Sequence, residues 1–393
     1  MREVVIVSAV RTPVGKFGGG LASLKAIDLG AIAIKEAVQR SGLAPEEIDY
    51  VYMGQVLQGG CGQIPSRQAA RLAGIPWETP SLTVNKVCAS GMISVALAAK
   101  MIAFGEIDRA VAGGMESMSQ APYILPQARW GQRMFNGQMV DLMVHDGLWC
   151  SFYDRHMVLH GSEVAKELGI SREQQDEWAC ISQDRAQAAI AAGRLQDEIV
   201  PVKIPGKKGQ ETVIDKDEQP RAGTTMEGLA KLPPLFDKQG TVTAGNAPSV
   251  NDGAGALVLM TREEALARGL KPLATFVGHA EVALEAKYLA KSPGLAINKL
   301  LNRHGLTVDA IDRFEVNEAF ASVVLGSQQI AGYDMSKVNV NGGAIAFGHP
   351  IGASGARILA SLVHELQRRG GGTGVAAICS GAAQGDAILL RVE

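Results

Sequence analysis

The chain has 393 residues, of which 47% are hydrophobic and 20% are charged, the composition of an ordinary globular protein with two or three domains' worth of core. Its formal net charge of −2 argues against a nucleic-acid partner, which would need a strong basic excess, and favours a small-molecule partner. Five cysteines, odd in number and without CxxC pairs, suggest neither a disulfide framework nor a zinc site, so a reducing compartment fits best.

The N-terminal segment begins with a predicted strand over residues 4–7. We expect no signal-type apolar segment, no Arg-rich presequence and no apolar run long enough to span a bilayer, so we predict a cytoplasmic protein without a membrane partner. A glycine-rich turn at residues 18–20, an amphipathic helix over 29–40 and a strand over 50–53 follow.

The stretch SLTVNKVCASGM, residues 81–92, places a cysteine where a strand turns into a helix. We predict a short buried strand over 82–84 and a helix over 89–104 that stops at Gly105. Cys88 then lies among unpaired backbone N–H groups, which favour the thiolate through the helix dipole and could hold an oxyanion. A buried structural thiol is the alternative, and Cys88 alone does not decide between the two.

Residues 119–243 differ in amino-acid composition from the segments on either side, because they are at first richer in Trp, Tyr, Arg and Met. Ser171 and Gln174 form a predicted capping box at the start of a helix through Trp178. Residues 201–209, with Lys203, Lys207 and Lys208, read as a loop, and these lysines taken alone indicate a solvated surface. Long insertions of this kind usually carry ligand and subunit contacts.

The second half of the chain repeats the first. A strand over 274–277, a helix over 296–303 and a strand over 313–316 recur with the same Gly-Leu to Ile-Asp spacing, and the order of residues 81–114 returns over 338–378. We therefore predict an α/β protein made of two copies of one unit. The halves are residues 1–118, completed by about 244–270, and residues 271–393, with 119–243 inserted between them.

Three chemical groups of the second half follow predicted strands. They are Asn317 in VNEAF, His349 in NGGAIAFGHPIGASGAR and Cys379 before Ser380-Gly381. Each alone would more often be structural, but ligands of open α/β sheets bind past the carboxyl ends of strands, and Cys88 occupies such a place in the other half. Because the glycines match no P-loop, GxGxxG or GxSxG pattern, we expect them to let a thioester approach between Cys88 and Cys379.

Several motifs together resemble the thiolases, in this order along the chain: NKVCASGM, TVTAGNA with NDGAGA, VNEAF, NGGAIAFGHPIGASGAR and CSGAAQG. NKVCASG is most similar to the biosynthetic acetoacetyl-CoA thiolases, the acetyl-CoA acetyltransferases. The resemblance implies a five-layer αβαβα fold of two similar halves with an inserted loop domain, assembled as a dimer or a tetramer. It also implies an acyltransferase that converts two acetyl-CoA to acetoacetyl-CoA and CoA, or runs the reverse thiolysis, without a cofactor or a metal.

The resemblance assigns roles to the reactive residues. Cys88 would attack acetyl-CoA to give an acyl-enzyme, with His349 lowering its pKa, and Cys379 would take the α-proton of a second acetyl-CoA. His349 with a water held by Asn317 would form one oxyanion hole, and the backbone N–H groups of Cys88 and Gly381 the other.

The same resemblance predicts residues that contact coenzyme A: Leu148, His156, Met157, Arg221, Phe236, Ala244, Gly245, Ala319 and Phe320. Pro248 and Gly228 stand where many biosynthetic thiolases carry serines, and Ser249 is the expected substitute for the first of them. The direction of the reaction stays open. The alternatives are a degradative 3-ketoacyl-CoA thiolase of broader chain length and, from another class, a non-catalytic acyl-CoA or lipid carrier.

Overall fold

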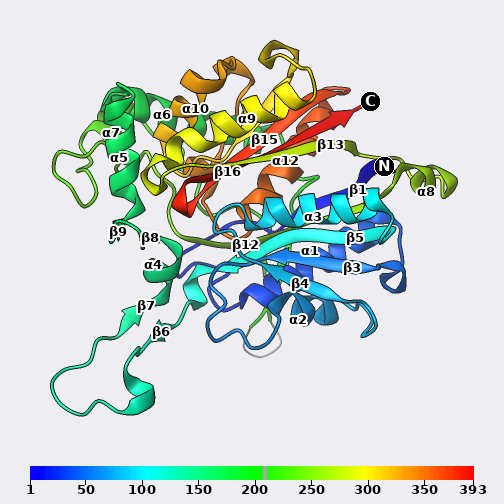
Figure 1. The fold of residues 1–393 in the computed structure, drawn as a ribbon, viewed down its shortest axis with the longest axis horizontal. Helices are drawn as coiled ribbons and strands as arrows, with labels where there is room; N and C mark the ends of the chain where they lie inside the picture. The colour runs from blue at the N-terminus through cyan, green and yellow to red at the C-terminus, as the bar shows by residue number, and fades with distance from the viewer. Residues whose placement is uncertain (207–209) are drawn as a thin grey trace.

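A ten-stranded sheet runs through the computed structural model, which describes residues 1–206 and 210–393 (Figure 1). Nine strands follow one another in the sheet in the order β14 (Arg313–Val316), β15 (Gly372–Ser380), β16 (Gln384–Val392), β13 (Ala274–Ala283), β1 (Val4–Arg11), β12 (Asn251–Thr261), β5 (Arg109–Ser117), β3 (Tyr50–Gly54) and β4 (Ser81–Val84). The short strand β2 (Gly15–Lys16) pairs with β12.

The strand order is symmetric about the pairing of β1 with β13. On one side β1, β12 and β5 are antiparallel neighbours and β3 is parallel to β5; on the other side β13, β16 and β15 are antiparallel and β14 is parallel to β15. The two sides join over only three residue pairs, from Val4 with Phe276 to Ile6 with Ala274. The backbone thus contains one strand arrangement twice, in agreement with the repeat in the sequence.

Two helices lie between the halves of this sheet. Helices α3 (Ser90–Phe104) and α12 (Ser354–Arg368) pack on each other, on β3 and β5, and on β15 and β16. Outside them, α1 (Ala26–Ser41) and α2 (Pro65–Leu72) cover the first half, while α9 (Ser292–Arg303) and α10 (Ala321–Ala331) cover the second (Figure 1). These are five layers, because each strand alternates its side chains between an inner and an outer core: in β1, Val4 and Ile6 face inward and Val5 and Val7 face α1.

Helix α3 is strongly apolar. It ends at Gly105, as predicted, whose φ of 87° is the left-handed conformation that glycine adopts without strain. Residues 87–104 reach a mean hydropathy of 1.9 over 18 residues, so the expectation that no apolar run is long enough to cross a bilayer is wrong on length. The segment is 61% buried, because both of its sides pack in the central layer.

Some predicted boundaries differ from the structure. The strands predicted over 4–7 and 274–277 continue to Arg11 and Ala283, because the antiparallel ladders of β1 and β13 extend along β12 and β16. The strand predicted as buried over 82–84 is instead the sheet edge β4, where Leu82 is 43% exposed. The strand expected near Val338 is reduced to one bridge with Phe314.

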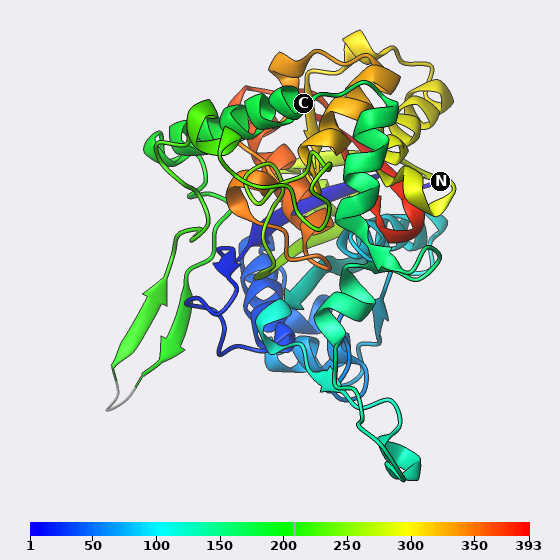
Figure 2. The same cartoon turned by 90° about the vertical axis from the view of Figure 1, so that its left-hand side faces the viewer.

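The segment between β5 and β12 contains two arms, the hairpins β6–β7 and β10–β11, which project from the body of the molecule (Figure 2). Its elements are β6 (Tyr123–Ile124), β7 (Val140–Asp141), α4 (Leu142–Gly147), β8 (Trp149–Cys150), β9 (Arg155–His156), α5 (Met157–Glu167), α6 (Arg172–Ala191), β10 (Val202–Pro205), β11 (Glu211–Ile214) and α7 (Met226–Ala230). Beyond the segment lie α8 (Arg262–Ala267) and α11 (Ala344–Phe347).

Two predictions for this segment have different outcomes. The capping box of α6 is confirmed, since Ser171 accepts from the N–H of Gln174 and the Gln174 side chain accepts from the N–H of Ser171 at 2.8 Å. The loop expected around Lys203 is wrong, because Lys203 lies on β10, which pairs with β11. Lys207 and Lys208 lie outside the described residues.

Candidate active site

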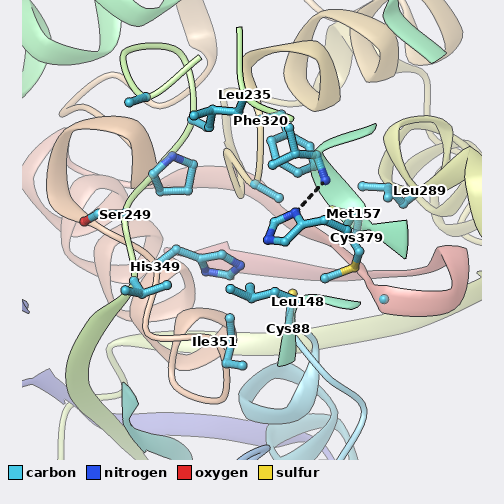
Figure 3. Close-up of a pocket in the computed structure, with 18 of the residues that line it drawn as sticks. Cys88, Leu148, Met157, Leu235, Ser249, Leu289, Phe320, His349, Ile351 and Cys379 are labelled. Atoms are coloured by element: carbon cyan, nitrogen blue, oxygen red, sulfur yellow. Dashed lines mark hydrogen bonds between the residues drawn. The ribbon is translucent and has the colours of Figure 1, made fainter. Parts of the chain in front are cut away.

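A pocket of about 420 Å³ lies where the two halves and the inserted segment meet (Figure 3). It brings together four of the five predicted catalytic residues: Cys88, His349, Cys379 and Gly381. It also contains nine of the ten predicted coenzyme A contacts: Leu148, His156, Met157, Arg221, Phe236, Ala244, Ser249, Ala319 and Phe320. The residues predicted from separate motifs therefore converge on one cavity.

Two predicted residues lie off the wall of this pocket. Asn317 follows β14 and is fully buried. Gly245 packs instead under α7, where a Cβ atom would lie 2.5 Å from Leu229 and 2.6 Å from Leu232, so its backbone position requires glycine for packing. A direct contact of Gly245 with a ligand is not what this geometry favours.

The sequence interpretation missed several wall residues, most of them apolar: Met118, Val158, Leu235, Ala247, Pro248, Val250, Leu289, Ile351 and Ser380. Pro248 was noted only as a departure from a family pattern, and Ser380 only as a neighbour of Cys379. The others carry no chemical signal in the sequence, since an apolar side chain that lines a pocket looks like one that fills a core.

The Cys88 turn lies between β4 and α3 and is held under strain. Val87 adopts a φ of 46°, which is unfavourable for a β-branched residue. Backbone strain of this kind costs of order 1–3 kcal/mol. Its N–H donates to the side chain of Asn85 at 3.0 Å, and the N–H of Lys86 donates to Ser90 Oγ at 2.8 Å. The ammonium group of Lys86 also pairs with the buried Asp386 of β16 at 2.8 Å. The nucleophile turn is thereby tied to the strand beside Cys379.

Burial dominates the electrostatics of Cys88. The side chain is 5% exposed, and desolvation raises the pKa of its thiol to about 12 although the backbone N–H groups of Gly381 and of Cys88 itself act in the opposite direction. The charge of Glu116 raises this pKa slightly further. The N–H groups of the turn thus lower the pKa of Cys88, as predicted, but burial outweighs them and the net shift is upward. The expected pair of N–H donors nevertheless faces the sulfur.

His349 is neutral and has a defined tautomer. Burial, and then the positive charge of Arg357, lowers the pKa of His349 to about 3. Its Nδ1 lies 2.6 Å from Ser354 Oγ, and this hydroxyl donates to the carbonyl of Pro350 at 2.9 Å. Because the Ser354 hydroxyl donates its hydrogen to Pro350, its oxygen can only accept a hydrogen bond from His349. His349 therefore carries its proton on Nδ1, and Nε2 keeps its lone pair.

The ring of His349 lines the pocket (Figure 3), and Nε2 has no partner among the described residues. The loop around it is fixed by Asn251, which accepts the N–H of His349 at 2.9 Å. Gly348 has a φ of 102° and a Cβ atom there would lie 2.5 Å from Asn251, so only glycine fits. His349 can therefore accept a proton inside the pocket.

Cys379 ends β15 and is 1% exposed. Burial, and then the charge of Cys88, raises the pKa of Cys379 well above its ordinary value. Because a charge on one sulfur disfavours a charge on the other, the site holds at most one thiolate readily. Two thiols that become thiolates one after the other, together with a neutral imidazole, can perform nucleophilic attack and proton transfer.

The part of the chain that the structure describes contains one cluster of side chains that could bind a metal ion. Donor atoms of His279, Glu281 and Asp386 lie within 4.8 Å of one another. The ammonium group of Lys86 already pairs with both carboxylates, at 2.5 Å and 2.8 Å, and supplies the positive charge there. The arrangement fits an ion-pair network that joins the halves of the molecule.

Comparisons with known proteins agree with one another. The family model "Thiolase, N-terminal domain" matches residues 4–263, and "Thiolase, C-terminal domain" matches residues 270–392. An acetyl-CoA acetyltransferase of Cupriavidus necator is 50% identical over 393 residues and covers 100% of both chains. One from Escherichia coli is 50% identical over 392 residues, 100% of this chain and 99% of that one. The crystal structure of the Bacillus anthracis acetyl-CoA acetyltransferase aligns with a TM-score of 0.97 and 41% identity, covering 100% of this chain and 99% of that one, which confirms the predicted fold class.

Proposed function

The chain belongs to the thiolase family, and from that premise we propose that it condenses two acetyl-CoA molecules to acetoacetyl-CoA and CoA and also catalyses the reverse thiolysis. Relatives that share about half of its residues over the full length are named acetyl-CoA acetyltransferase. The observation that carries the proposal is the single pocket into which Cys88, His349 and Cys379 converge. It is an acyltransferase.

In the first half-reaction, Cys88 becomes acylated. The thiol passes its proton to Nε2 of His349, whose lone pair has no partner among the described residues, and the sulfur attacks the thioester carbonyl. The N–H groups of Cys88 and Gly381, which face the sulfur, hold the developing oxyanion. The carbon–sulfur bond to CoA then breaks, and the CoA thiolate recovers the proton from His349.

In the second half-reaction, Cys379 acts as the base. Once acylated, Cys88 can no longer carry the charge that, after burial, raises the pKa of Cys379, so Cys379 can give its proton to Nε2 of His349 and become the thiolate that this step needs. Cys379 takes the α-proton of the second acetyl-CoA, and the resulting carbanion attacks the acyl carbon. His349, now protonated at Nε2, and Asn317 stabilise the enolate oxygen. Cys88 leaves as a thiolate and receives the proton from His349, while Cys379 keeps the α-proton as a thiol.

The wall of the pocket suits the pantetheine arm of coenzyme A. It is mostly apolar, and at its mouth the rings of His156 and Phe236 stack with centroids 4.5 Å apart. Phe236 is 68% exposed, so one of its faces is open for further stacking. Arg221 is also exposed and can pair with a phosphate or stack on a base. These features support a CoA thioester as substrate.

The deciding experiment is thiolysis of 3-ketoacyl-CoA substrates of increasing chain length by the wild type and by Cys88→Ala. We expect acetoacetyl-CoA to be the best substrate and the variant to be inactive. Equal or faster turnover of long chains would support the degradative alternative instead. CoA-thioester binding without any thiolysis by the wild type would support a carrier.

We also propose a homodimer or homotetramer. Strand β4 pairs only with β3 in the described part of the sheet and leaves an open edge. The β6–β7 arm (Figure 2) exposes large apolar side chains, namely Leu125, Trp130, Met134, Phe135 and Met139.

Free cysteines support a cytoplasmic location, and the net charge of −2 is consistent with the absence of a nucleic-acid partner. No cofactor enters this scheme, since the CoA thioesters are substrates.

A further inference from the structure

The motif GHPIGASGAR contains a residue to which the reaction above gives no role. Arg357 lies on α12 and is 3% exposed, beneath the wall of the pocket. One of its terminal nitrogens, Nη2, lies 3.5 Å from Oδ1 of Asn317. This contact joins the central helix to the residue that follows β14.

We propose that Arg357 is a positioning residue, which fixes the Asn317 amide so that its nitrogen, and not its oxygen, is presented to the reaction. The proposal rests on the proposed function. It assigns a task within the proposed thiolase reaction to a side chain that lies off the pocket wall.

The physical basis is the donor and acceptor inventory of the two groups. An arginine side chain only donates hydrogen bonds, whereas an asparagine amide has one accepting and one donating end. Arg357 therefore selects the orientation in which Oδ1 faces it, because the opposite orientation would bring two sets of N–H groups together. With Oδ1 engaged, Nδ2 of Asn317 is a buried donor without a partner among the described residues. An oxyanion or its bound water needs such a donor, whereas an oxygen presented there would repel it.

The surroundings keep this arginine charged and in place. Burial lowers the pKa of Arg357 and the charge of Arg11 acts in the same direction, while Glu315, Glu198 and Glu318 oppose this shift and favour the charged guanidinium. Glu198 is itself bound at 2.7 Å by Arg11, which also pairs with Asp217 at 2.6 Å. The positive charge of Arg357 also contributes to keeping His349 neutral. Burial is the larger cause of the low pKa of His349, so His349 stays neutral without Arg357 and the effect of Arg357 on the reaction passes through Asn317.

A double-mutant cycle tests the proposal. Wild type, Arg357→Met, Asn317→Ala and the double variant are compared in steady-state thiolysis of acetoacetyl-CoA. A hydrogen bond to a charged group predicts a fall in kcat of about tenfold for Arg357→Met at nearly constant KM, and loss of an oxyanion donor predicts about 10²-fold for Asn317→Ala. If Arg357 acts through Asn317, the double variant is no slower than Asn317→Ala alone. A further tenfold loss in the double variant would overturn the proposal.

Arg357→Met leaves Glu315 buried without its main countercharge, so a second pair of variants guards against misfolding. Arg357→Met/Glu315→Gln is compared with Glu315→Gln, and we expect its kcat to be about tenfold lower. In the Asn317→Ala background the same pair of variants should show no such difference in kcat. Arg313→Met is the matched control, since Arg313 lies on the strand that leads to Asn317 but pairs with Glu365 at 3.1 Å, and its kcat should stay at the wild-type value. Failure of the wild type to cleave acetoacetyl-CoA would refute the proposed function, whereas additive losses in an active enzyme refute only this inference.

Discussion

Ser354→Ala should impair the enzyme through the tautomer of His349. In the structure the Ser354 hydroxyl accepts Nδ1–H at 2.6 Å and donates to the Pro350 carbonyl at 2.9 Å. Because its hydrogen is used on Pro350, this hydroxyl favours the imidazole that keeps the Nε2 lone pair for the proton of Cys88. Alanine removes the preference and leaves Nδ1–H, when it is present, buried without an acceptor.

The magnitude follows from the cost of that buried donor. An unsatisfied buried N–H costs about 1–3 kcal/mol, and a factor of ten in population corresponds to about 1.4 kcal/mol. The reactive tautomer should therefore become about 5- to 150-fold less populated. We expect kcat to fall about 10- to 100-fold and KM to change less than about twofold, because Ser354 is fully buried on α12 and does not line the pocket.

The assay combines acetoacetyl-CoA thiolysis with the rate at which iodoacetamide alkylates Cys88, which should slow in parallel. Ser361→Ala is the control, since Ser361 is a buried serine of the same helix that bonds to Glu198 at 3.2 Å. Its kcat should match the wild type. If Ser354→Ala retains kcat within about twofold in a folded enzyme, His349 does not depend on this hydroxyl and the tautomer argument is wrong.

Three further predictions concern the base, the ligand loop and pH. Cys379→Ala should still acquire an acetyl group on Cys88, seen by peptide mass, while acetoacetyl-CoA formation is lost; failure of both steps in a folded protein would contradict the assigned roles. Pro248→Ser should change KM for acetyl-CoA by less than about twofold at constant kcat, because Ser249 beside it already lines the pocket, and a several-fold change in kcat would show that this loop shapes the reacting geometry. Burial raises the pKa of Glu116 from its ordinary 4.5 to about 7, so its contribution to stability is complete below pH 4.5 and is lost as the pH rises through 7; Glu116→Gln should make this fall of Tm shallower, and an unchanged slope would argue against the raised pKa.

Features that depend on nearby residues were predictable. The capping box at Ser171 and the helix end at Gly105 matched the structure, because caps are formed by backbone groups within one turn. The repeated Gly-Leu and Ile-Asp spacing likewise indicated the duplicated strand order. The reactive turns were recognisable because Cys88, Cys379 and His349 each lie in a short segment rich in small residues.

Features that depend on distant neighbours were not predictable. Nothing in residues 81–84 shows that β4 has a partner on one side only, so it was expected to be buried. Lys203 has a polar setting in the sequence, yet its backbone pairs in β10 with β11. The apolar wall residue Leu289 comes from a segment without any chemical motif.

The sequence by itself determined the reactive side chains and the turns that carry them, because positive φ angles, caps and strand-to-helix junctions are set by residues a few positions apart. The tertiary structure alone decided how these turns act on one another. It placed the Gly381 N–H against Cys88, Arg357 against Asn317 and Ser354 against His349, and it buried both thiols so deeply that desolvation outweighs the helix dipole. Desolvation and charge interactions depend on distance in space, and segments far apart in the chain come close only when the two halves close around the central helices.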